Sequence, residues 1–240
     1  MNIWWPYARL AASVLGFAAL IAQLARTFEV ALHATTPWGA HLPTVGVNFF
    51  SFFTVLSNLG AAVALAIGAI WAWTKGKDAA REPRWLAVTL TCVATYMIVT
   101  GIVYNVLLRG IELPQGSTVG WSNEVLHVVI PLFLLADVLL APKRRMLTWS
   151  TVLVVAAFPI AWAVYTLVRA NLIISPALGT PYWYPYPFLN PHTTPGGYLG
   201  VTGYVIGIAA VILVVGAAVV WVARKRAASV DSVQPAVVTA

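Results

Sequence analysis

Six apolar segments, each of roughly 20 residues, constrain the fold of this 240-residue chain more than any other feature. An α-helix rises about 1.5 Å per residue, so about 20 residues cross the roughly 30 Å hydrocarbon core of a bilayer. The segments are Leu10–Phe28, Phe49–Trp73, Trp85–Leu108, Trp121–Ala141, Met146–Val168 and Tyr198–Ala223. They predict an all-α integral membrane protein with six transmembrane helices.

The distribution of charge predicts how the chain crosses the membrane. Hydrophobic residues make up 60% of the chain and charged residues 9%, against roughly 25% charged in soluble domains. The net charge of +7 comes mainly from three clusters that fall on one side: Lys75, Lys77, Arg81 and Arg84; Lys143, Arg144 and Arg145; and Arg224, Lys225 and Arg226. The positive-inside rule makes that side cytoplasmic, with both termini inside. The basic excess therefore indicates topology and contact with anionic lipids, not nucleic-acid binding.

The domain organisation is simple. We expect residues 1–226 to form one six-helix transmembrane domain and residues 227–240, which lack apolar periodicity, to form a disordered cytoplasmic tail. The single cysteine, Cys92, excludes an intramolecular disulfide and a cysteine-cluster metal site. The run YWYPYPFLNPHTTPGG before the last segment is rich in proline and aromatic residues. It is either an anchor at the membrane interface or a cap over a cavity.

Polar side chains collect near the outer ends of the predicted helices, where such groups usually face the bundle interior or a cavity. Thr54 in the second segment and His127 in the fourth lie at similar depths in the outer leaflet. Thr54 shares a helical face with Ser51 and Asn58, and His127 shares one with Asn123. The other polar residues at this level are Arg26, Glu29, Tyr104, Asn105, Glu124 and Arg169. We expect one polar pocket near the outer surface.

Pro131 marks the same place in the fourth segment. Proline has no N–H group to bond the carbonyl four residues earlier, and here that carbonyl belongs to His127. The helix is therefore expected to bend at the histidine and to leave a backbone acceptor for water, a hydroxyl or a substrate group. Proline kinks are also common in membrane helices without chemistry, so this feature supports a site only modestly.

Thr54 and His127 have the chemistry of a nucleophile and its base. Histidine is the usual base for a hydroxyl nucleophile because its unperturbed pKa lies near 6.5. Asn123 or Glu124 could orient the imidazole or bind an oxyanion. The structural alternative is that Thr54 bonds the carbonyl of Phe50 in its own helix and that His127 is a hydrogen-bond donor between helices.

Three motifs carry a resemblance to a known family: FFSFFTVLSN in the second segment, NEVLHVVIP in the fourth and YPYPFLNP before the sixth. With the six-helix layout, they resemble a bacterial group of six-pass membrane proteins. That group is similar to the eukaryotic androgen-induced-gene and androgen-dependent tissue-factor-inhibitor-regulating proteins. The eukaryotic members are membrane threonine hydrolases that cleave fatty acid esters of hydroxy fatty acids. By motif, their threonine corresponds to Thr54 and their histidine to His127.

The resemblance implies an integral membrane hydrolase of lipid or fatty acid esters in a bacterial plasma membrane. Its partners would be membrane lipids and a lipid ester substrate that enters sideways from the outer leaflet, and no metal or organic cofactor is required. Candidates for substrate or oxyanion binding are Ser51, Asn58, Asn105, Asn123, Glu124, Arg26 and Arg169. Two departures limit the transfer: the eukaryotic motif has a second histidine where this chain has Glu124, and the aromatic–proline run belongs to the bacterial group.

Other classes of function stay open from the sequence. A transporter or channel would depend on Asp137, the one acidic residue placed well into the inner half, although no inverted repeat is detectable. A bis-histidine haem site lacks a second histidine within a segment. Zinc binding by His33, His41 and His192 with Glu29 matches no familiar spacing. A non-enzymatic protein with a structural polar pocket is the remaining alternative.

Overall fold

The computed structural model describes residues 4–36, 38–111 and 118–233, which form helices and connections without strands. Six helices are long and apolar enough to span a membrane, as expected of a multi-pass integral membrane protein. They are α1 (Trp5–Leu32), α3 (Phe53–Trp73), α4 (Arg84–Val103) with the π-helical turn η1 (Tyr104–Leu108), α5 (Gly120–Glu124) with the π-helical turn η2 (Val125–Val129) and α6 (Ile130–Leu140), α7 (Thr151–Ala170), and α8 (Tyr198–Val233). The short elements α2 (Leu42–Phe49) and η3 (Pro187–Leu189) lie in the connections.

The second predicted segment, Phe49–Trp73, is not one helix. α2 ends at Phe49, and α3 begins only after Phe52, whose backbone is extended. The Ser51 hydroxyl donates to the carbonyl of Val47 at 2.7 Å, and the Phe52 ring packs against aromatic side chains of the distant connection between α7 and α8. These contacts stabilise a break that local hydrophobicity does not reveal. Ser51 is therefore not on the helix that carries Thr54 and Asn58, contrary to the prediction.

The last helix also differs from the sequence prediction. α8 runs to Val233, so residues 227–233 are helical where the sequence predicted a disordered tail. Ala227 is almost fully buried, and its carbonyl accepts a hydrogen bond from Arg81 in the loop between α3 and α4. This docking extends the helix beyond its apolar part. Residues 234–240 of the predicted tail lie outside the described residues.

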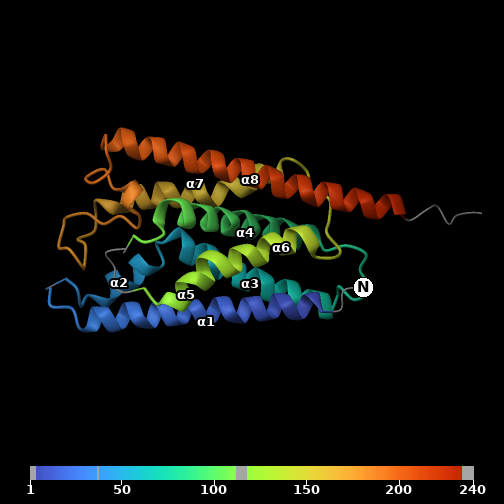
Figure 1. The fold of residues 1–240 in the computed structure, drawn as a ribbon, viewed down its shortest axis with the longest axis horizontal. Coiled ribbons are helices and arrows are strands. Elements are labelled where there is room, and N and C mark those ends of the chain that lie inside the picture. Colours follow the sequence, from blue (N-terminus) through green and yellow to red (C-terminus); the bar gives the residue numbers. More distant parts are fainter. Residues whose placement is uncertain (1–3, 37, 112–117, 234–240) are drawn as a thin grey trace, which may run out of the picture.

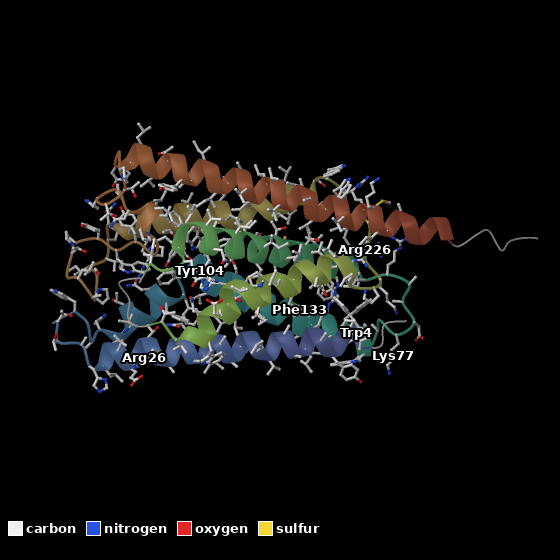
Figure 2. All side chains as sticks on the ribbon, viewed as in Figure 1. Trp4, Arg26, Lys77, Tyr104, Phe133 and Arg226 are labelled. Carbon is white, nitrogen blue, oxygen red and sulfur yellow. The ribbon has the colours of Figure 1, made fainter. Side chains whose placement is uncertain are left out.

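α4 lies at the centre of the bundle, in contact with α3, α6, α7 and α8. α1 lies at one edge of the bundle, where it packs against α3, α5 and α6 (Figure 1). Lys77, Arg226 and the start of α1 lie together at one end, and Arg26 lies at the other (Figure 2). We call these the basic end and the loop end. The loop end carries α2 and the long connection between α7 and α8.

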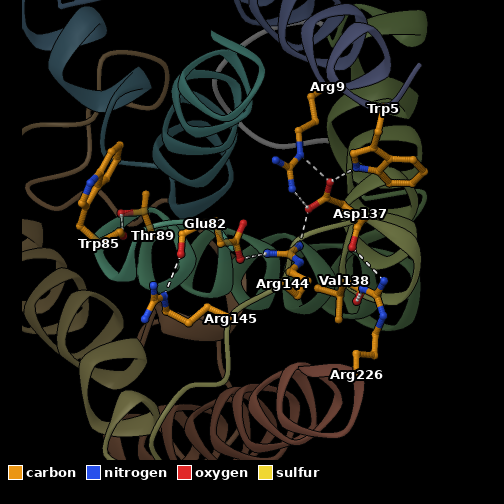
Figure 3. A network of polar contacts seen from close by, with 11 residues as sticks. Trp5, Arg9, Glu82, Trp85, Thr89, Asp137, Val138, Arg144, Arg145 and Arg226 are labelled. Carbon is orange, nitrogen blue, oxygen red and sulfur yellow. Dashed lines mark hydrogen bonds and ion pairs between the residues drawn. The ribbon is translucent and has the colours of Figure 1, made fainter. Parts of the chain in front are cut away.

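A buried ionic network holds the basic end together (Figure 3). The Asp137 carboxylate of α6 is fully buried and accepts hydrogen bonds from Arg9 Nε at 2.7 Å, Arg9 Nη2 at 3.1 Å and Trp5 Nε1 at 2.7 Å. Arg144, in the loop before α7, also donates to Asp137, and it reaches Glu82 at 3.4 Å. Two buried acids thus face two buried arginines from four parts of the chain.

The helices leave room for this network. A Cβ on Gly68 of α3 would lie 3.1 Å from Arg9 Nη1, so a side chain there would press on the guanidinium group.

Next to Asp137 in the sequence, the end of α6 is also bonded to α8. Arg226 of α8 donates to the carbonyls of Val138 and Ala141 at 2.9 and 2.8 Å. The end of α8 is thereby bonded to the end of α6.

We expect Asp137→Asn to lower the free energy of unfolding by about 3 to 5 kcal/mol, because it leaves Arg9 and Arg144 buried without their shared counter-charge. Unfolding of purified protein in detergent micelles would measure the change. Glu29→Gln is the matched control: it breaks the pair with Arg26, in which the Glu29 side chain is 58% exposed, and should cost less than about 1 kcal/mol. Equal stability of the two variants would contradict a structural role for the network.

Candidate functional site

An apolar cavity of about 170 Å³ lies between α3, α4, α7, α8 and the connection before α8. Its wall is mainly aliphatic and aromatic. The lining residues with polar atoms are Thr54, Thr100, Tyr104, Trp162 and Tyr186. A cavity of about 150 Å³ in another protein is large enough to bind benzene. This space can therefore hold a short stretch of hydrocarbon.

Thr54 lies in the first turn of α3, where backbone N–H groups have no acceptor within the helix. Its N–H donates to the phenol oxygen of Tyr186 at 3.1 Å, and its hydroxyl oxygen lies 3.2 Å from the same atom. Both side chains are buried. Burial raises the pKa of the Tyr186 phenol, so that it stays protonated at neutral pH. Tyr186 thus caps α3 and contacts the candidate nucleophile at once.

Tyr186 reaches this position because the aromatic–proline run folds into the bundle. The backbone N–H of Trp183 donates a hydrogen bond of 2.8 Å to the carbonyl of Ala170 at the end of α7. The Tyr186 ring then packs on Phe52 and Trp162, with centroid distances of 5.5 and 6.0 Å. Tyr186, Phe188 and Leu189 all line the cavity. Of the two alternatives for this run, a cap over a cavity describes its position.

His127 lies in the π-helical turn η2, just before Pro131, where the sequence predicted a distortion. Its Nδ1 lies 2.9 Å from the carbonyl oxygen of Asn123. A carbonyl can only accept, so Nδ1 carries the proton and the neutral ring keeps its lone pair on Nε2. Asn123 therefore orients the imidazole through its backbone. Nε2 is the nitrogen that could act as a base.

Tyr104 connects His127 to the cavity wall. The two rings stack with centroids 4.0 Å apart and planes 25° apart, and the Tyr104 phenol accepts a hydrogen bond from the Asn123 side chain. Tyr104 also lines the cavity, whereas His127 is not among the lining residues. The imidazole thus lies behind the Tyr104 ring, held by the same asparagine.

Asn58 joins the helices that carry the threonine and the histidine. Its side-chain amide donates to the carbonyl of Thr54 at 3.0 Å and to that of Leu126 at 3.1 Å. The residue before His127, Leu126, therefore lies beside the Thr54 turn. The Thr54 hydroxyl has Tyr186 as its hydrogen-bond partner in this structure, and not His127.

The remaining candidates form separate pairs near the loop end instead of one pocket with Thr54. None of them is among the residues that line the cavity. Each finds a polar partner close to its own helix end, which satisfies it locally. The pairs are Ser51 with Tyr165, Arg169 with Asn48, Asn105 with Arg109, Glu124 with Arg109, and Arg26 with Glu29.

Two residues at the site were missed by the sequence reasoning. Tyr186 was not distinguished from its neighbours, because the sequence does not show which of several aromatic residues in the aromatic–proline run faces inward. Gly101 of α4 was not considered, although it allows the close approach of the proline kink. A Cβ there would lie 3.0 Å from Pro131 Cβ and 3.4 Å from the carbonyl oxygen of His127.

Comparisons with family models, curated proteins and solved structures found no match to this chain. The site therefore rests on its own geometry. It combines a buried threonine on the wall of an apolar cavity, a fixed imidazole on a neighbouring helix, and two phenols, Tyr186 beside Thr54 and Tyr104 beside His127.

We expect Gly101→Ala to lower the free energy of unfolding by about 1 to 3 kcal/mol, because the added methyl group presses on Pro131 and on the His127 carbonyl. Thermal unfolding in detergent would measure this. Gly60→Ala is the control, since its Cβ would make only an ordinary 3.7 Å contact with Val93. If Gly101→Ala were as stable as the control, the close packing at the kink would have no energetic role.

Proposed function

We propose that this chain is an integral membrane hydrolase of lipid or fatty acid esters, with Thr54 as nucleophile and His127 as general base. One observation carries the proposal: the buried Thr54 lines a hydrocarbon-sized cavity and lies beside the turn that presents His127 with Nε2 unprotonated. The three motifs that resemble the bacterial six-pass group and the threonine hydrolases add support. Fatty acid esters of hydroxy fatty acids are the substrate class that this resemblance favours.

The proposed orientation places the basic end in the cytoplasm and the loop end outside the bacterial plasma membrane. Support comes from the clusters of lysine and arginine at one end of the bundle, which also holds the start of α1 and the end of α8. The cavity would then lie in the outer leaflet. An ester held there would be within reach of Thr54 without leaving the bilayer.

In the first half of the reaction, His127 Nε2 takes the proton from Thr54 as the threonine oxygen bonds to the ester carbonyl carbon. For this, the Thr54 hydroxyl must exchange its Tyr186 partner for His127. The oxyanion that forms lies near the Thr54 N–H and the Tyr186 O–H, both of which are donors. The carbon–oxygen bond to the alcohol then breaks, and the leaving oxygen takes the proton from His127.

In the second half, water removes the acyl group from Thr54. His127 Nε2 takes a proton from the water as its oxygen attacks the acyl carbon, and the threonine oxygen leaves with that proton. The products are a fatty acid and an alcohol, and the enzyme returns to its starting state. Asn123 and Tyr104 hold the imidazole through both halves by the hydrogen bond to Nδ1 and by stacking. This route needs no metal or organic cofactor.

The transport alternative is less well supported, because it depended on Asp137. That carboxylate is held by hydrogen bonds from Trp5, Arg9 and Arg144 and is fully buried. An ion-coupling carboxylate would need to exchange such partners for a transported ion. The described contacts instead fit a structural role for Asp137.

The proposal is tested by hydrolysis of fluorogenic fatty esters by detergent-purified protein. We expect Thr54→Ala and His127→Ala each to lower kcat/KM by at least about 100-fold, since each removes a reacting group. Ser51→Ala is the control, because the Ser51 hydroxyl bonds Val47 and Tyr165 away from the cavity. Folded protein without activity, or activity that survives both active-site substitutions, would contradict the assignment.

We expect Tyr186→Phe to lower kcat by roughly 10- to 100-fold with a smaller effect on KM, because the phenol contributes to the oxyanion and not to apolar binding. Steady-state kinetics on the same esters would measure both constants. Tyr7→Phe removes a phenol from a side chain that is 60% exposed on α1, away from the cavity, and serves as control. An unchanged kcat in Tyr186→Phe would show that the Tyr186 phenol does not stabilise the oxyanion and that its role is to cap α3.

A further inference from the structure

A second apolar space lies next to the cavity, on the outer surface of the bundle between α4 and α8. It is an open groove of about 520 Å³. Its sides include Val106 of η1, which is 74% exposed, and Tyr204 of α8. Its floor is a row of glycines on one face of α8, Gly200, Gly203 and Gly207. Because α4 and α8 are candidate membrane spans, this groove faces hydrocarbon.

The groove and the cavity share part of their walls. Val103 of α4 and Ile208 of α8 line both spaces, so these two aliphatic side chains form the partition between them. Phe188, on the cavity wall, contacts Tyr204, on the groove wall, with ring centroids 5.8 Å apart. The two spaces are thus neighbours that meet at these side chains.

The volumes show why such a connection matters. The cavity, at about 170 Å³, is close to the roughly 150 Å³ that accommodates one benzene molecule. A fatty acyl chain with many more carbons than benzene does not fit inside it. The adjoining groove, at about 520 Å³, offers the additional apolar length.

The glycines that form the floor differ in what the fold requires of them. A Cβ on Gly200 would lie 2.1 Å from the carbonyl oxygen of Pro195, so the fold itself requires that glycine. A Cβ on Gly203 or Gly207 would meet nothing within 4 Å. At these two positions the absence of a side chain keeps the groove open, and no intramolecular contact explains it.

We propose that this groove binds the hydrocarbon chain of a bilayer lipid and is the lateral path by which a long-chain ester reaches Thr54. One acyl chain lies along Gly203 and Gly207, and the ester end passes between Val103 and Ile208 into the cavity. The wall that the two spaces share and the position of the groove on the membrane face favour a lipid chain over a second protein helix. Delivery to Thr54 rests on the proposed hydrolase function, whereas lipid binding in the groove does not.

The test fills the groove without disturbing the fold. The double variant Gly203→Leu and Gly207→Leu has open space at both Cβ positions, and Ala218→Leu adds the same side chain at an exposed position elsewhere on α8. Each protein, in nanodiscs, is irradiated with a phosphatidylcholine that carries a diazirine on one acyl chain. Labelled peptides are then mapped by mass spectrometry.

We expect labelling of the Val106 and Tyr204 peptides, relative to the exposed face of α1, to fall at least about fivefold in the double variant and to stay unchanged in Ala218→Leu. Hydrolysis of an oleoyl ester should fall at least about tenfold in the double variant, while a butyryl ester, whose short acyl chain fits the cavity without the groove, is cleaved at the wild-type rate. Both results together support the groove as binding site and path.

Three outcomes would overturn the proposal. Unchanged labelling in the double variant would show that the lipid chain does not bind in this groove. Unchanged labelling together with loss of a wild-type dimer would assign the groove to a second copy of the chain. Equal loss of oleoyl and butyryl hydrolysis would show that the groove is not the path of a long-chain ester to Thr54. If no ester is cleaved even by the wild-type protein, the proposed function fails, and the labelling result still decides lipid binding.

Discussion

The unsatisfied N–H groups at the start of α3 are the constraint on which the loop end of this protein depends. The break after α2 leaves donors in an apolar environment, where an unpaired backbone group costs several kcal/mol. The Tyr186 phenol supplies an acceptor for the Thr54 N–H, and to do so the part of the aromatic–proline run from Trp183 to Tyr186 folds into the bundle. That folding closes the cavity and buries Thr54. The cap of one helix and the wall of the candidate site are therefore the same interaction.

Buried polar groups have different kinds of partner at the two ends of the bundle. At the basic end, Asp137, Glu82, Arg9 and Arg144 balance one another in charge and bond four parts of the chain together. At the loop end, hydroxyls, an imidazole and amides bond mostly to backbone carbonyls and to one another. The first arrangement fixes the helices. The second leaves groups such as His127 Nε2 with capacity for a further partner, which is what a reacting site requires.

The sequence predicted the features that depend on local composition. Apolar length gave the six spans, and the pairing of Pro131 with His127 anticipated the distortion in which η2 lies. The break near Ser51 could not be predicted, because Phe49 to Phe53 is apolar except for Ser51 and the packing of Phe52 on a distant connection decides the backbone. The same holds for Tyr186 and for Trp5 and Arg9 as partners of Asp137. Contacts between residues more than 100 positions apart carry no local signal.

Covalent acylation of Thr54 during ester cleavage is the step on which the proposed mechanism depends. The most direct measurement mixes purified protein with an activated fatty ester, stops the reaction in acid within one turnover, and maps the acyl group by peptide mass spectrometry. We expect an acyl adduct on Thr54 that disappears when the reaction is left to complete. Ester cleavage without an adduct on Thr54, or with the acyl group on another side chain, would contradict the account.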